Sequence, residues 1–289
     1  MAKEKPLRSN ALLVDVPIHE GNRKDLLRFS SCAEVLGQAA VETPESITIG
    51  IYGKWGTGKT SMMRLIMHKI SDKINVVPVW FNAWQYEREE HLIIPLTTTI
   101  TRTMDKYIKE NRWESGVKDA CEKLQNALRS IAYGFTLKGK VGIPGVSGLG
   151  VNLSAKDMIK RYDELAKDFE VGRSLYYDAF EKLTEFVKQS GSNAPRIVVF
   201  VDDLDRCFPA NAVALLEGIK LVLNQQGLSY IIGINDEIIR EFVKTKYAKE
   251  CLMESHFFED YLDKIVQVKV SIPENEPDSM QEYINELLK

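Results

Sequence analysis

The chain has 289 residues, of which 44% are hydrophobic and 27% are charged, a composition typical of a globular protein with a substantial core. Its formal net charge of −3 argues against a protein that holds nucleic acid or an anionic membrane through a general basic field. No stretch approaches the roughly 18 consecutive apolar residues of a membrane-spanning helix, so we expect no membrane span.

The cysteines and histidines give no sign of a metal site or a disulfide framework. Four of each are scattered along the chain, without the close spacing of metal ligands. The first ten residues, MAKEKPLRSN, lack the apolar core of a secretory signal. We therefore expect reduced thiols and a cytoplasmic protein.

The first part of the chain predicts a helix, a strand and a second helix. Apolar residues recur at helical spacing over residues 23–41, within a helical lead-in that we place at residues 1–46. The run ITIGIY at 47–52 predicts a buried strand, and residues 59–70 predict a helix. The sequence GIYGKWGTGKTSMM therefore places a glycine-rich bend between a strand and a helix.

The next segment predicts an edge strand and then an insertion. INVVPVWFNAW at 74–84 is rich in strand-forming residues, and Pro78 favours a position at the sheet edge. Two helical stretches within residues 91–195 flank a glycine-rich segment at 133–154, which predicts a hairpin or a mobile loop. We expect residues 91–195 to form a mainly helical insertion into the core fold.

Strands and helices alternate in the remainder of the chain. The predicted strands are residues 196–205, 228–235 and 264–272, and the predicted helices are residues 211–224 and 236–247. This alternation predicts an α/β fold with a parallel, doubly wound sheet.

We place the core domain at residues 47–275. Residues 276–289 contain the helical pattern QEYINELLK without a capping residue. We expect them to begin a C-terminal helical region that continues beyond Lys289.

The bend after the first strand matches the phosphate-loop pattern G-x-x-x-x-G-K-[ST]. Glycines let successive backbone N–H groups face phosphate oxygens, the lysine reaches the β- and γ-phosphates, and the threonine hydroxyl ligates magnesium. We therefore predict that nine consecutive residues bind the nucleotide: Gly53, Lys54, Trp55, Gly56, Thr57, Gly58, Lys59, Thr60 and Ser61.

Two aspartates follow the buried run VVFV at 198–201. At the end of a strand, Asp202 would hold the magnesium ion together with Thr60, and Asp203 would polarise an attacking water. The structural alternative is a turn or a helix N-cap, which uses the same residue types. The phosphate loop upstream favours the catalytic interpretation.

Two further residues have open assignments. Arg206 could neutralise transition-state charge on the nucleotide of a neighbouring subunit, which would require a homo-oligomer, or it could pair with the aspartates beside it. Asn235, at the end of the strand LSYIIGIN, could sense the γ-phosphate or orient the water, or it could cap the following helix.

Taken together, four stretches resemble the KAP family of P-loop NTPases. They are GIYGKWGTGKTSMM at 50–63, VWFNAWQYE at 79–87, VVFVDDLDRCFP at 198–209 and YLDKIVQVKVSIP at 261–273. The resemblance implies an additional-strand P-loop NTPase fold, similar to AAA+ and signalling (STAND) NTPases, with ATP and Mg²⁺ as cofactors. Family members have been linked to phage exclusion, which suggests a defence role by analogy.

The resemblance fails in one region. Many family members carry paired membrane spans in the insertion, but here Lys138, Lys140 and a series of glycines cannot form a lipid-spanning helix. The sequence therefore resembles a member of bacterial type without a membrane anchor. Trp80, Trp84 and Tyr86 in the second motif either pack the edge strand against the insertion or contact the nucleotide.

The sequence supports more than one function. The first is an ATPase that acts as a molecular switch, read out by a protein partner through the insertion or the C-terminal region. The second is a nucleotide-binding interaction module with little or no hydrolysis. A small-molecule phosphotransferase is a third, but no acceptor pocket or arginine-rich lid is evident in the sequence.

Overall fold

The computed structural model describes residues 29–110, 195–221, 223–247 and 261–272. In chain order its elements are α1 (Ser30–Glu42), β1 (Thr48–Tyr52), α2 (Lys59–Ser71), β2 (Val76–Asn82), the 3-10 helix η1 (Ala83–Tyr86), α3 (Ile93–Lys109), β3 (Arg196–Asp202), the 3-10 helix η3 (Leu204–Arg206), α7 (Pro209–Leu221), β4 (Leu228–Ile234), α8 (Asp236–Tyr247) and β5 (Val268–Ser271).

These strands form one parallel sheet in the order β2-β3-β4-β1-β5. The strand β4 lies between β1 and β3, which is the additional-strand arrangement of a P-loop NTPase. The predicted parallel α/β fold is therefore confirmed. The strand β2 lies at an edge, as Pro78 predicted, where a residue without a backbone N–H is tolerated.

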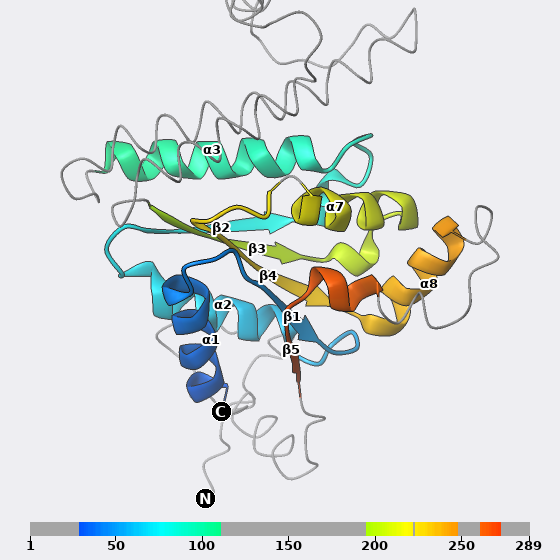
Figure 1. Cartoon of the computed structure of the whole chain (residues 1–289), viewed down its shortest axis with the longest axis horizontal. Coiled ribbons are helices and arrows are strands. Elements are labelled where there is room, and N and C mark those ends of the chain that lie inside the picture. The colour runs from blue at the N-terminus through cyan, green and yellow to red at the C-terminus, as the bar shows by residue number, and fades with distance from the viewer. Residues whose placement is uncertain (1–28, 111–194, 222, 248–260, 273–289) are drawn as a thin grey trace, which may run out of the picture.

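Helices cover both faces of the sheet (Figure 1). The helices α3 and α7 lie on one face, and α1 and α2 lie on the other. The interior strand β3 divides its side chains between the two cores in strict alternation: Ile197, Val199 and Val201 enter the first, and Val198 and Phe200 enter the second. A strand buried on both faces explains the unbroken apolar run in its sequence.

Several predicted boundaries change. The predicted strand 196–205 ends at Asp202, because Asp203 adopts a left-handed backbone conformation with φ 56°. The predicted strand 264–272 begins only at Val268, because residues 261–265 are helical.

Other predictions lie partly outside the described residues. The predicted helix over residues 23–41 is described only as α1, and the predicted insertion only in α3 and its flanking residues. The glycine-rich segment and residues 276–289 lie wholly outside. Among the described helices, none has the length and apolar character to cross a membrane.

Arg196 connects the sheet to the end of α1. Its guanidinium donates hydrogen bonds to the carbonyl oxygens of Ala40 and Glu45 and to the hydroxyl of Ser229, at 2.9, 3.1 and 2.7 Å. Burial lowers the pKa of Arg196 to about 10, which still leaves it charged at neutral pH. This half-buried cation therefore fixes the segment that leads into β1.

We predict that Arg196→Met lowers the free energy of unfolding by about 2–4 kcal/mol, because two carbonyls and a hydroxyl lose their charged donor. Chemical denaturation measures the change, and Arg102→Met on the exposed surface of α3 is the matched control. Equal stability of the two variants would contradict the structural role of Arg196.

Candidate functional site

The loop between β1 and α2 has the backbone of a phosphate cradle. Gly56 and Gly58 have φ values of 79° and 98°, in the left-handed region that favours glycine. A Cβ atom at Gly53 would lie 2.4 Å from the Thr57 hydroxyl, so a larger residue there would displace the Thr57 side chain. The Gly53 N–H donates to the carbonyl of Ile234 at 3.1 Å, which ties the start of the loop to β4.

Lys59, the first residue of α2, points back into this loop. Its ammonium donates to the carbonyls of Gly53 and Lys54 at 2.9 and 3.1 Å, and it lies 3.6 Å from the Asp205 carboxylate. Only 10% of the Lys59 side chain is exposed. Lys59 is therefore held close to the backbone of the loop that is predicted to bind the phosphates.

The two predicted magnesium ligands are in contact. The Thr60 hydroxyl lies 3.0 and 3.2 Å from the two Asp202 carboxylate oxygens and donates to them. Mg²⁺ prefers oxygen ligands and usually binds one or two protein groups together with substrate phosphates. Within the described residues no cluster of three or more His, Cys, Asp or Glu side chains could hold a metal ion. The hydroxyl of Thr60 and the carboxylate of Asp202 are oxygen groups that fit a magnesium ion bound together with phosphates.

Asp202 is buried, and its environment opposes ionisation. Burial, and next the charge of Asp203, raise the pKa of Asp202 above its ordinary value of 3.8. The hydrogen bond from Thr60 and the charge of Arg64 act in the opposite direction. A cation bound beside Asp202 would relieve this cost.

Asp203 is held from two sides. One carboxylate oxygen accepts a hydrogen bond from the Asn82 amide at 2.8 Å, and the other lies 2.9 Å from Nε of Arg206. The Arg206 guanidinium also lies 5.3 Å from the centroid of the Trp84 ring. Of the two alternatives for Arg206, the described structure contains the pair with a neighbouring aspartate.

Asn235 occupies the start of α8. It is buried, directly after β4, and its carbonyl accepts the N–H of Ile239, which is the first hydrogen bond of the helix. Since β4 lies between β1 and β3, Asn235 lies at the same carboxyl-terminal end of the strands as the phosphate loop and Asp203.

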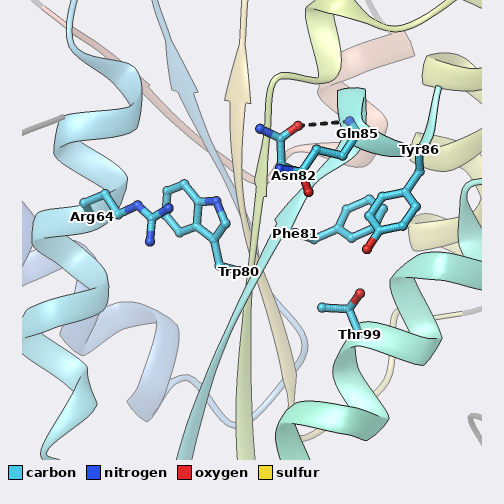
Figure 2. Close-up of a pocket in the computed structure, with 7 residues that line it drawn as sticks. All are labelled: Arg64, Trp80, Phe81, Asn82, Gln85, Tyr86 and Thr99. Carbon is cyan, nitrogen blue, oxygen red and sulfur yellow. Dashed lines mark hydrogen bonds between the residues drawn. The ribbon is translucent and has the colours of Figure 1, made fainter. Parts of the chain in front are cut away.

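A small pocket adjoins Asn82 at the edge of the sheet (Figure 2). It has a volume of about 160 Å³ and is lined by Arg64, Trp80, Phe81, Asn82, Gln85, Tyr86 and Thr99. The Arg64 guanidinium lies 3.5 Å from the Trp80 ring on one side of β2, and Tyr86 stacks on Phe81 on the other. Two of the three motif aromatics, Trp80 and Tyr86, therefore pack against the core, whereas Trp84 is 46% exposed.

Sequence reasoning missed two residues of this site. Asn82 is the last residue of β2 and holds Asp203, and Asp205 in η3 contacts both Trp55 and Lys59. Asn82 carried a usable signal, because it is a polar residue near the end of the predicted strand 74–84. The contacts of Asp205 carried none, because they join residues 150 and 146 positions apart.

Comparison with known proteins gives one family. A model described as the KAP family P-loop domain matches residues 29–289. The Phage T7 exclusion protein of Escherichia coli is 25% identical over 281 residues, which cover 92% of this chain but only 35% of that protein. An uncharacterized protein of Methanocaldococcus jannaschii is 25% identical over 185 residues, which cover 58% of this chain and 95% of that protein.

A solved structure, the ORC2 protein of Aeropyrum pernix in its ADPNP–ADP complexes, aligns with 94% of this chain and 54% of its own length. The alignment has a TM-score of 0.43 and a sequence identity of 10%.

The raised pKa of Asp202 predicts how replacing this residue changes the stability of the protein at different pH values. A carboxyl whose pKa is higher in the folded state destabilises that state when it is ionised, so Asp202→Asn should raise the melting temperature of the nucleotide-free protein. The advantage should grow as the pH rises above the ordinary pKa of an aspartate, 3.8, because the folded wild-type protein then holds Asp202 ionised in an environment that opposes its charge. Thermal unfolding of both proteins, with Asp72→Asn on the exposed end of α2 as control, measures the difference. A pH-independent difference would contradict this account.

Proposed function

Because the chain belongs to the KAP family of P-loop domains, we propose that it binds ATP with magnesium and hydrolyses it as a molecular switch. The observation that carries the proposal is that three groups lie together at the carboxyl-terminal end of the parallel strands. These are the loop with Lys59, the pair of Thr60 and Asp202, and Asp203 beside them. A turn that served only the fold would not need this combination.

In this proposal residues 53–61 bind the phosphates. The backbone N–H groups of the loop and the N-terminal end of α2 face the anion, and Lys59 supplies a positive charge. Phosphate loops do not read the base, so the preference for ATP rests on the family.

Thr60 and Asp202 would hold the magnesium ion. When bound, the ion would neutralise negative charge on the β- and γ-phosphates. The chain's own contribution is a hydroxyl and a carboxylate that already lie within 3.2 Å of each other.

Asp203 would act as the general base. Water attacks the γ-phosphorus, the bond to the β–γ bridging oxygen breaks, and Asp203 accepts the proton of the water. Each of its oxygens already has one partner, so a water would need the second acceptor position of one oxygen, or the release of Arg206 or Asn82. Asn235, on the neighbouring strand end, would orient the water or sense the γ-phosphate, in addition to its position at the start of α8.

An in-trans role for Arg206 would require two events. The ion pair with Asp203 must break, and a second copy of the chain must bring its nucleotide to the guanidinium. Arg206 is 45% exposed, which leaves it accessible to such a copy. A homo-oligomer therefore belongs to this part of the proposal.

The biological setting is inferred from one relative. The name of the Escherichia coli protein, Phage T7 exclusion protein, supports a role in phage defence. We place this role in the cytoplasm, and we propose that a protein partner reads the nucleotide state through the predicted insertion or the C-terminal region.

One observation favours a second function, a nucleotide-binding interaction module with little turnover. Both carboxylate oxygens of Asp203 already have a neighbouring side chain as a partner, which restricts the approach of a water to either oxygen. If nothing releases Asp203, the chain would bind ATP without cleaving it. Turnover measured with and without a candidate partner distinguishes the two functions.

We predict that Lys59→Ala raises the Kd for ATP at least about 100-fold, equivalent to the loss of a strong charge-assisted contact. Isothermal titration calorimetry measures the affinity. Lys73→Ala, at an exposed ion pair with Glu42, is the matched control and should bind as wild type does. Unchanged affinity in Lys59→Ala would exclude the phosphate site.

We predict that Asp203→Asn keeps ATP affinity but lowers kcat at least about 100-fold, the usual contribution of a general base. Release of inorganic phosphate measures turnover, and Asp72→Asn controls for the loss of an aspartate elsewhere. Turnover at the wild-type rate would show that Asp203 is not the base.

A further inference from the structure

Asp205 receives two donors from the phosphate loop on the same oxygen. The Trp55 indole N–H donates to Oδ2 at 3.2 Å, and the Lys59 ammonium lies 3.6 Å from the same atom. The Asp205 side chain is only 3% exposed. A buried carboxylate is stable only with such partners, so the loop and η3 stabilise each other.

The contact with Asp205 gives a reason for the exposed tryptophan in the loop, Trp55. Trp55 is 61% exposed, and a large indole at the tip of a loop gains little from burial. Its N–H, however, is the donor that reaches Asp205. We therefore assign Trp55 the task of fixing the Asp205 carboxylate beside Lys59.

Lys59 has three partners in this arrangement, of which two lie within hydrogen-bond distance. An ammonium group has three N–H donors, and here it has three partners, namely the carbonyls of Gly53 and Lys54 and the Asp205 carboxylate. The two carbonyl contacts are hydrogen bonds of ordinary length within the loop, whereas the contact with Asp205 is longer than a hydrogen bond. The contact with Asp205 is thus the one that a terminal phosphate would displace first.

We propose that Asp205 is a specificity-determining residue of the nucleotide site, which competes with the terminal phosphate for Lys59. A triphosphate places more negative charge near Lys59 than a diphosphate does, so the buried carboxylate opposes the triphosphate more strongly. Asp205 would then shift the preference of the site towards the diphosphate. The inference rests on the proposed nucleotide binding and adds the residue that sets the preference.

The test compares two affinities on the full chain. Calorimetry with Mg²⁺ gives the Kd values of ADP and of a non-hydrolysable ATP analogue for wild type, Asp205→Asn, Trp55→Phe and the double variant. We expect Asp205→Asn to bind the analogue about tenfold more tightly, a change of about 1.4 kcal/mol, with a much smaller change for ADP.

The Trp55 variant tests the same contact from the exposed side. Trp55→Phe removes the indole donor, keeps an aromatic ring and does not touch the buried carboxylate. It should shift the ratio of the two Kd values in the same direction by about threefold, a change of about 0.7 kcal/mol. The double variant should match Asp205→Asn alone, because both changes act through one carboxylate. Glu241→Gln, which changes an exposed carboxylate paired with Lys244, is the control and should leave the ratio unchanged.

Two outcomes would overturn the inference. One is an unchanged ratio in both Asp205→Asn and Trp55→Phe, and the other is an equal loss of affinity for both nucleotides, which indicates a purely structural role. If wild type binds neither nucleotide, the proposed function itself fails, and this result is distinct from the other two. If Asp205→Asn does not fold, an unchanged ratio of the two Kd values in Trp55→Phe is by itself sufficient to overturn the inference.

Discussion

The register of the parallel sheet places every group of the candidate site. Asn82 pairs with Asp202 across β2 and β3, and Tyr52 pairs with Ile234 across β1 and β4. Since all strands run in the same direction, the segments that follow these residues begin at the same end of the sheet. A shift of one residue in a strand that is buried on both faces would exchange the side chains that it presents to the two cores. The alternation that builds the two cores therefore also fixes the positions of the polar groups at the strand ends.

The helix α2 serves the site and the core at once. Its first turn supplies Lys59 and Thr60, and its next turns bury Met63 and Ile66 against the sheet. The side chains that contact Asp202 and Asp205 are thus attached to a helix that cannot shift without opening the second core. This attachment holds the polar groups in place even though several of them are costly to bury.

Sequence reasoning predicted most of the fold because strands buried on both faces are unbroken apolar runs. It also placed the phosphate loop, Asp202, Asp203 and Asn235 at strand ends, because polar residues there interrupt those runs. It extended the range of β3 to residue 205, because the actual end depends on one backbone dihedral angle, and it missed the start of β5, where the pattern KIVQVKV is compatible with either helix or strand. The contacts of Asp205 were also beyond reach, because they join distant segments only after the sheet has formed.

The left-handed backbone at Asp203 limits which acid the position can accept. Aspartate and asparagine tolerate a φ of 56° better than other residues with a side chain, because their short polar groups can hydrogen-bond locally. Glutamate carries the same carboxylate, but it lacks this tolerance and is one methylene longer. The identity of the acid is thus constrained by the turn of the main chain as well as by chemistry. Relatives that carry glutamate at the equivalent position would need a different bend after the strand.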